Sequence, residues 1–198
     1  MKTKVKERYF SSQISRKDAI EKLANHYLRR NPQISYAFGL FDRTRNGSLV
    51  AVITYGSPAS PTLCKGLCGE DERLNVIELN RLWADSSVSN DAIMFFIKEN
   101  FKTVSKEIIV SFVPPDHERI VRLFKFIGFY YTGLTAKAMQ RINKDGTVSP
   151  HHRHNCYNKT TTYLAPAPRK HRFVFFNSGN ADRKHDLFNK LRYEVVKY

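Results

Sequence analysis

Three stretches of the chain carry apolar residues at every third or fourth position, which is the period of an amphipathic helix. They span residues 15–30, 90–101 and 116–126. Ser15 and Asp18 form a pattern typical of a helix start, and Pro32 ends the first helix. Asp116 suits the N-cap of the third helix, because its side chain accepts hydrogen bonds from free backbone N–H groups.

Apolar runs rich in β-branched and aromatic residues predict strands in five further places. They span residues 34–41, 48–55, 74–83, 108–113 and 128–132. Asn46-Gly47, between the first two, is a strong signal for a β-hairpin. In the third strand, strict alternation places Glu78 and Asn80 on one face and Arg81 on the other.

The predicted elements follow the order helix, strand, strand, strand, helix, strand, helix, strand. The hairpin makes the first half antiparallel, and the later alternation of strands and helices implies right-handed crossovers and a parallel part. The expected fold class is α/β (α+β), with a mixed sheet flanked by helices within residues 1–136. Residues 56–72, rich in glycine, proline and serine, are expected to form a long loop.

The pattern changes after residue 136. No period is visible over residues 137–168, and only a short strand at 173–176 and a helix at 182–191 are predicted beyond it. Residues 137–198 hold 13 Lys and Arg against 4 Asp and Glu, a net charge of +9. We interpret this part as a basic C-terminal extension that packs on the core and contacts nucleic acid.

Charge is also the main signal of the whole chain. Its 198 residues carry a net charge of +15, typical of a protein that binds a phosphate backbone, so a nucleic acid is the expected partner. An anionic membrane is the alternative, but no basic amphipathic helix stands out. A hydrophobic fraction of 41% excludes a disordered chain. With no apolar run of transmembrane length and no signal sequence, a cytoplasmic location is expected.

The predicted element order resembles the GNAT acyltransferase fold. In that fold the sheet splays, and the pyrophosphate of an acyl-CoA binds at the N-terminus of the next helix. The corresponding turn here is residues 84–90, ADSSVSN, which lacks the glycine-rich GNAT motif. Phe124 stands near the position of the general-acid tyrosine of many GNAT enzymes. The donor is therefore expected to be an acyl-CoA or another activated compound.

Five strings, in order, resemble Mom-like phage DNA-modification proteins. They are His26-Tyr27, residues 53–58 (ITYGSP), residues 77–83 (IELNRLW), residues 111–133, and residues 170–177 (KHRFVFFN) followed by KLRY at 190–193. The resemblance implies a GNAT-fold enzyme that modifies adenine N6 in phage DNA within the host cytoplasm, against host restriction. It also implies an iron requirement. Two alternatives remain: a GNAT transferase acting on tRNA, protein or a small amine, and a non-enzymatic DNA-binding protein.

Candidate catalytic residues come from three predicted elements. They are His26, Tyr27, Glu78, Arg81 and Asp116. Glu78 is a candidate base or ion-pair partner, and Arg81 a candidate contact for an anion. The resemblance raises His26 above an ordinary surface histidine and Tyr27 above a core residue of its helix. His26 with Asp116 is also a partial ligand set for iron.

Two further sets complete the candidate residues. Donor-binding candidates are Ser57, Arg81, Ser86, Ser87, Ser89 and Asn90. Nucleic-acid-binding candidates are Arg169, Lys170, Arg172, Arg183, Lys184, Lys190 and Arg192. Both sets have a plain alternative, since serines are common in turns and basic residues on solvated surfaces.

Overall fold

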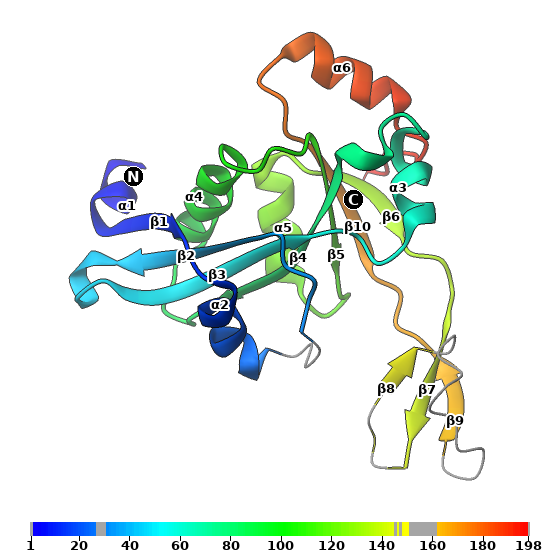
Figure 1. Cartoon of the computed structure of the whole chain (residues 1–198), viewed down its shortest axis with the longest axis horizontal. Helices are drawn as coiled ribbons and strands as arrows, with labels where there is room; N and C mark the ends of the chain where they lie inside the picture. The colour runs from blue at the N-terminus through cyan, green and yellow to red at the C-terminus, as the bar shows by residue number, and fades with distance from the viewer. Residues whose placement is uncertain (1, 27–30, 145, 147, 151–161, 198) are drawn as a thin grey trace.

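The computed structural model describes residues 2–26, 31–144, 146, 148–150 and 162–197. A seven-stranded sheet in the order β1-β2-β3-β4-β5-β10-β6 forms its centre (Figure 1). The strands are β1 (Tyr9–Gln13), β2 (Tyr36–Asp42), β3 (Ser48–Gly56), β4 (Val76–Ala84), β5 (Ile108–Val113), β6 (Tyr130–Leu134) and β10 (His171–Phe176). Only β4 and β5 pair in parallel; the other neighbours are antiparallel. The predicted mixed sheet is confirmed.

Helices cover both faces of this sheet. They are α2 (Arg16–Lys22) with the 3-10 turn η1 (Leu23–Asn25), α3 (Pro61–Cys68), α4 (Asn90–Phe101), α5 (Glu118–Ile127) and α6 (Ala181–Lys190). Strand β5 shows how the faces divide: Ile109 packs in one core cluster with residues of α4 and α5. Ile108 and Val110 point the other way, into a cluster with residues of α3 and α6. Helix α2 packs on the latter face, over β2 and β3.

The β2–β3 hairpin forms where the sequence predicts it. Asn46 has a φ of 53° and Gly47 a φ of 68°, which is the left-handed conformation that this dipeptide favours. Helix α4 begins behind the N-cap Ser89, and its predicted apolar residues are buried. Helix α5 starts later than expected: its N-cap is His117, not Asp116, and no side chain caps it.

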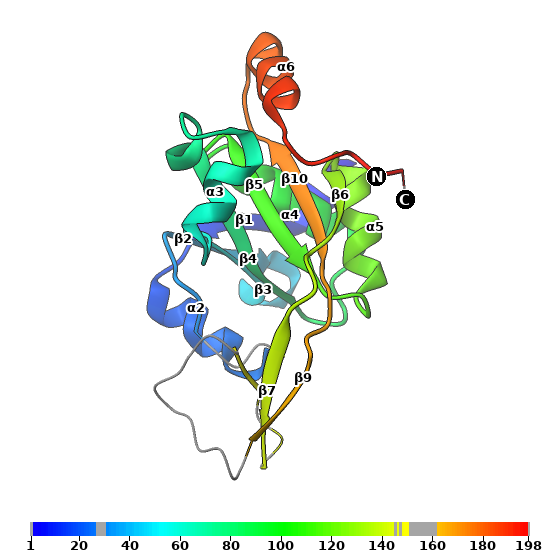
Figure 2. The same cartoon turned by 90° about the vertical axis from the view of Figure 1, so that its right-hand side faces the viewer.

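Three parts of the fold were not predicted. Residues 56–72 do not form only a loop, because Ser60 caps α3 and Pro61 occupies its first turn. The N-terminus contains α1 (Lys2–Arg8) and the edge strand β1, whose short polar sequence gives little strand signal. A second sheet of β7 (Met139–Asn143), β8 (Val148–Pro150) and β9 (Thr162–Pro166) projects from the main body (Figures 1 and 2).

Strand β10, from the C-terminal third of the chain, is part of the main sheet. It lies between β5 and β6, and Phe173 and Val174 are completely buried. The main sheet therefore includes strands from both sides of the expected boundary at residue 136. The chain leaves this sheet after β6, forms the small sheet, and returns to the main sheet as β10. Among the described residues, no helix has the length and apolar character needed to cross a membrane.

Candidate active-site cleft where β4 and β5 separate

The parallel pair β4 and β5 is joined over only a short length. Residues 76–78 pair with residues 108–110, and beyond them the strands separate. The Ser111 hydroxyl donates a hydrogen bond of 2.9 Å to the Leu79 carbonyl at the start of the gap. A cleft of about 310 Å³ opens there, lined by residues 79–84 of β4, by the end of β5 and by the start of α5. The carboxyl ends of strands at such a separation are where α/β folds place ligand sites.

A β-bulge in β4 changes which side chains share a face. Tyr55 of β3 pairs with Leu79, but its neighbour Thr54 pairs with Arg81, so Asn80 is an extra residue. Such an insertion reverses the alternation beyond it. Glu78 and Arg81 therefore lie on the same face of the sheet, that of α2 and α3. The expectation from strict alternation, which put them on opposite faces, is wrong.

Asn80 holds the bulge in place. Its Oδ1 accepts a hydrogen bond of 2.6 Å from the Thr54 hydroxyl, and its Nδ2 donates one of 2.8 Å to the Gln33 carbonyl. Gly56 allows this approach, because a Cβ there would lie 1.9 Å from the same Gln33 oxygen. The bulge is thus fixed to the segment that precedes β2.

Glu78 combines burial with nearby positive charge. It is the last residue of β4 that pairs with β5, and the Ala59 N–H donates a hydrogen bond to its carboxylate. Burial raises the pKa of the Glu78 carboxyl, while Lys170, Arg81 and the Ala59 N–H each act to lower it. A carboxylate whose pKa is raised above its usual range is a stronger base, so this side chain suits proton abstraction. Glu78 does not itself line the cleft; it immediately precedes Leu79, which does.

Arg81 and His26 reach the cleft from different elements. Arg81 lines it from β4, half-buried, and its Nη1 donates a 2.6 Å hydrogen bond to the Asn80 carbonyl. His26 follows η1 and also lines the cleft, with only 7% of its surface exposed. A surface histidine was the alternative to the catalytic role expected from the resemblance, but the 3-10 turn ends before His26 and its side chain is buried. Tyr27 lies outside the described residues.

Asp116 is not part of this arrangement. Its side chain is 79% exposed, does not line the cleft, and lies 4.0 Å from His117 Nε2. Across the described ranges, no group of three or more His, Cys, Asp or Glu side chains is placed to hold a metal ion. His26 and Asp116 therefore do not fit the iron site that the sequence resemblance implied.

Comparison with known proteins gives the family. A model of the Mom protein family matches residues 8–198. The chain belongs to the Mom protein family. None of the curated proteins compared with the sequence matches it.

Solved structures give the fold of this Mom-family chain. It is similar to yncA of Salmonella typhimurium, solved with acetyl-CoA, at 10% identity and a TM-score of 0.52 over 87% of this chain and 96% of that one. It is also similar to Arabidopsis thaliana NAA60 in complex with acetyl-CoA, at 12% identity and a TM-score of 0.51 over 85% of this chain and 99% of that one. A third similar structure is spermidine/spermine N-acetyltransferase SpeG of Vibrio cholerae in complex with manganese ions. It has 11% identity and a TM-score of 0.50 over 90% of this chain and 98% of that one. The expected GNAT fold is confirmed.

The turn before α4 in this Mom-family chain lacks the glycines of a GNAT pyrophosphate-binding turn. The Val88 N–H donates to the Asp85 carbonyl, and Ser89 Oγ accepts from the Ala92 N–H. Arg119 of α5 donates to the Val88 carbonyl and to Asn90 Oδ1, at 2.8 and 2.7 Å. These bonds engage the N–H groups of Val88 and Ala92, and the turn contains no glycine, so it differs from the glycine-rich turn of GNAT enzymes.

The other predicted donor residues lie outside the cleft. Ser57, Ser86, Ser87, Ser89 and Asn90 are exposed, and none of them lines it. Sequence reasoning missed Trp83, Ser111 and Arg119, which do line it. A tryptophan at the end of a strand was a usable signal, whereas nothing local marks Ser111 or Arg119. Phe124 also lines the cleft and stacks on Phe129 at 4.5 Å between ring centroids, so no hydroxyl acid stands at that position.

The basic candidates of the C-terminal part have different surroundings. Arg183 binds Glu72, Glu107 and Asp186, and Lys190 binds Glu72 and Asp186. Arg172 bonds to Thr132 and lies 3.4 Å above the Tyr193 ring.

The remaining four basic candidates have fewer internal contacts. Lys184 and Arg192 are exposed, Arg169 donates to the Thr135 carbonyl, and Lys170 is half-buried near Glu78. Of the seven basic candidates, the exposed Lys184 and Arg192 are better placed to contact a binding partner than the paired residues.

Proposed function

We propose that this Mom-family protein is a transferase that modifies adenine at N6 in double-stranded DNA. The match of the family model to residues 8–198 is the observation that carries the proposal. The GNAT fold supports a group-transfer reaction, and the net charge of +15 supports a polyanionic substrate. Protection of phage DNA from host restriction is the expected consequence of such a modification.

The reaction needs a base near the adenine amine. N6 attacks an electrophilic carbon of the donor, a C–N bond forms, and the bond between that carbon and its leaving group breaks with the electron pair. The N6 proton passes to the Glu78 carboxylate, which lies beside the cleft, next in sequence to Leu79 of its lining, and whose raised pKa makes it an effective acceptor. Arg81, beside it, stabilises negative charge that develops on the donor.

Adenine inside a duplex cannot reach such a site. Enzymes that act on a base therefore turn it out of the helix, at a cost that stacking in the pocket offsets. Trp83, half-buried at the end of β4, gives the cleft an aromatic wall, and His26 and Arg81 give it polar groups. We assign this cleft to the extruded adenine.

The donor is an activated acyl or alkyl compound. The yncA and NAA60 structures hold acetyl-CoA, which makes it the first donor to test. Because the turn at residues 84–90 lacks glycine, a donor that does not place a pyrophosphate at α4 is the second to test.

The test is expression of the full chain in a bacterium, followed by mass spectrometry of the deoxynucleosides from its DNA. A deoxyadenosine of increased mass is expected, together with DNA that resists restriction endonucleases. The modification should fall by about 10²–10⁴-fold in Glu78→Gln, the usual contribution of a general base. Glu118→Gln, an exposed carboxylate of α5, is the matched control and should retain it.

Two other outcomes of the same experiment would indicate a different function. Unmodified DNA with acylated tRNA or protein would identify a different acceptor for the same fold. Unmodified DNA together with tight DNA binding would identify a binding protein without transferase activity. Either result would overturn the proposal.

A further inference from the structure

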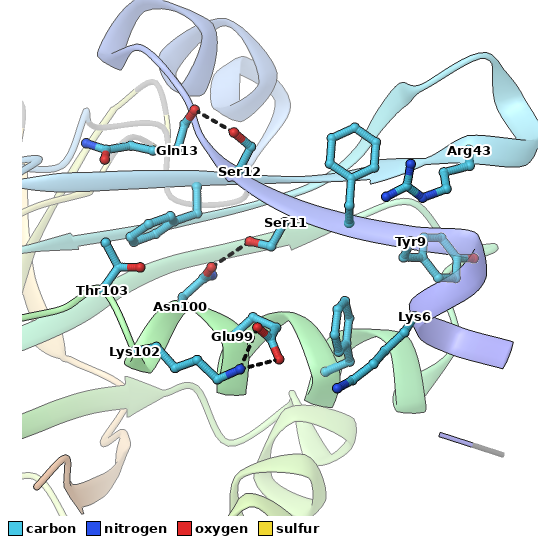
Figure 3. A pocket seen from close by; sticks show the side chains of 13 residues that line it. Lys6, Tyr9, Ser11, Ser12, Gln13, Arg43, Glu99, Asn100, Lys102 and Thr103 are labelled. Atoms are coloured by element: carbon cyan, nitrogen blue, oxygen red, sulfur yellow. Dashed lines mark hydrogen bonds and ion pairs between the residues drawn. The ribbon is translucent and has the colours of Figure 1, made fainter. Parts of the chain in front are cut away.

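A second hollow lies away from the cleft, between the edge strand β1 and the C-terminal half of α4 (Figure 3). Its volume is about 470 Å³, within the range of small-ligand pockets. It shares no lining residue with the cleft at β4 and β5. We call it the β1–α4 groove.

The floor of the groove contains a buried amide with an unused donor. Asn100 is 1% exposed, and its Oδ1 accepts a hydrogen bond of 2.7 Å from the Ser11 hydroxyl across the groove. Within the described part of the chain, Asn100 Nδ2 has no acceptor. A buried N–H without an acceptor costs free energy, so an oxygen of a bound molecule would stabilise this arrangement.

The rim of the groove is positively charged. Lys6, Arg43 and Lys102 line it, against the single carboxylate of Glu99. Both oxygens of Glu99 lie 2.8 Å from Lys102 Nζ, so this carboxylate is already neutralised. Among the described residues, Lys6 and Arg43 have no carboxylate partner. The groove therefore favours an anion.

Aromatic rings form its walls. Tyr9, Phe10 and Phe95 line it, and the Arg43 guanidinium lies 4.6 Å from the centre of the Phe10 ring. Aromatic rings and guanidinium planes both stack on nucleobases. Cations, a buried donor and flat apolar walls together match a planar ring that carries a phosphate.

We propose that the β1–α4 groove is a nucleotide-binding site, separate from the cleft. The phosphate is held by Lys6 and Arg43, and an oxygen of the nucleotide accepts from Asn100 Nδ2. The nucleotide has one of two sources: a free mononucleotide, or an unpaired nucleotide of a DNA strand. This site does not depend on which reaction the cleft performs.

The test is a titration of the ¹⁵N-labelled full chain with dTMP, which has no exocyclic amine and so does not imitate the proposed substrate base. The side-chain amide signal of Asn100 is expected to shift. Thymidine and inorganic phosphate should each bind at least about tenfold more weakly than dTMP, because each lacks one half of the ligand. A single-stranded oligothymidylate that shifts the same signal at lower concentration identifies a DNA strand as the source. A shift with dTMP alone identifies the free nucleotide.

Variants assign the binding to this groove. Lys6→Gln and Asn100→Asp should each weaken dTMP binding roughly tenfold, measured by calorimetry, since each removes a donor to the phosphate or nucleotide oxygens. Lys98→Gln, an exposed lysine of α4 that does not line the groove, should bind as the parent chain does. No shift with dTMP or the oligothymidylate, equal binding of inorganic phosphate, or unchanged binding by Lys6→Gln would overturn the proposal. Because Lys6 is exposed, that variant stays informative if Asn100→Asp fails to fold.

Discussion

Arg81 lies on the same face of β4 as Glu78, and its guanidinium acts against the burial that raises the pKa of the Glu78 carboxyl. The two residues are brought together by one extra residue, Asn80. A carboxylate placed in this way is a stronger base than an exposed one, and Arg81 favours its ionised form. The pair therefore sets the pH at which Glu78, beside the cleft, can act as a base.

Removing Arg81 should shift the pH dependence of the reaction. Burial raises the pKa of Glu78 and Arg81 lowers it, so Arg81→Gln leaves the pKa higher. The acidic limb of the pH–rate profile, where Glu78 becomes protonated, is expected to move to higher pH. Rates of DNA modification between pH 5 and pH 9 measure this. Arg122→Gln, an exposed arginine of α5, should leave the profile in place, and an unmoved limb in Arg81→Gln would exclude Glu78 as the base.

Glu78→Gln should separate stability from activity. Because the folded-state pKa of Glu78 is raised, ionising it disfavours the folded protein, and the loss grows as the pH rises through that pKa. The neutral variant is therefore expected to melt a few degrees higher than the parent at neutral pH, with the difference vanishing below about pH 4. Thermal melts at several pH values test this, alongside the loss of modification. A variant that is less stable at neutral pH would show that the carboxylate is structural.

Most helices and strands of the main sheet could be predicted from the sequence. Its apolar periods predicted α4, β5 and the β2–β3 hairpin with nearly correct bounds, because those elements bury regular stripes. β1 was missed because a short polar edge strand pairs with only one neighbour. Strand β10 was predicted, but its place between β5 and β6 was not, since no local pattern states which strands pair.

The site was harder to predict than the fold. Glu78 and Arg81 were candidates because polar residues in an apolar strand are unusual. The bulge that unites them depends on hydrogen bonds that Asn80 accepts from Thr54 and donates to the carbonyl of Gln33, which lies 47 positions away in the chain. Arg119 was missed for the same reason, since its partners Val88 and Asn90 belong to another element. Long-range contacts decide the site, and they leave no local signature.

Asn80→Ala should damage the bulge and the reaction together. It leaves the Thr54 hydroxyl, which is completely buried, without its acceptor, and frees the Gln33 carbonyl. An expected loss of about 1–3 kcal/mol in the free energy of unfolding follows from the unsatisfied buried group. Urea unfolding measures it. Thr54→Val removes the other partner and is the control: it should cost less, because no polar atom is left buried at position 54. Equal activity of Asn80→Ala and the parent would show that the bulge does not position the site.

The exposed cations should contribute differently from the paired ones to DNA binding. Lys184→Gln removes a solvent-exposed charge of α6 and is expected to reduce the salt dependence of DNA affinity by roughly one unit of slope. Arg183→Gln, next to it in sequence, removes a guanidinium held by three carboxylates, so it should mainly lower stability. Affinity measured between 50 and 200 mM salt, with thermal melts of both variants, distinguishes the two effects. The reverse result would mean that the Arg183 cluster opens on binding DNA.

Glu72 should govern the response of the protein to acid. Hydrogen bonds from Arg183 lower the pKa of this carboxyl from 4.5 to about 2, with Asn75 and Lys190 adding to the effect. Because the folded-state pKa is depressed, the stabilisation is present above about pH 4.5 and is lost as the pH falls toward 2. Glu72→Gln is expected to lower the free energy of unfolding by about 1–3 kcal/mol at neutral pH. Its stability should also decline less steeply below pH 4.5 than that of the parent, because one titrating group is gone. Glu70→Gln, which removes an exposed carboxylate bound to Lys65 and Arg73, should change stability little. Denaturant unfolding of the three proteins from pH 2 to pH 7 tests this, and parallel curves for Glu72→Gln and the parent would show that the network does not link stability to pH.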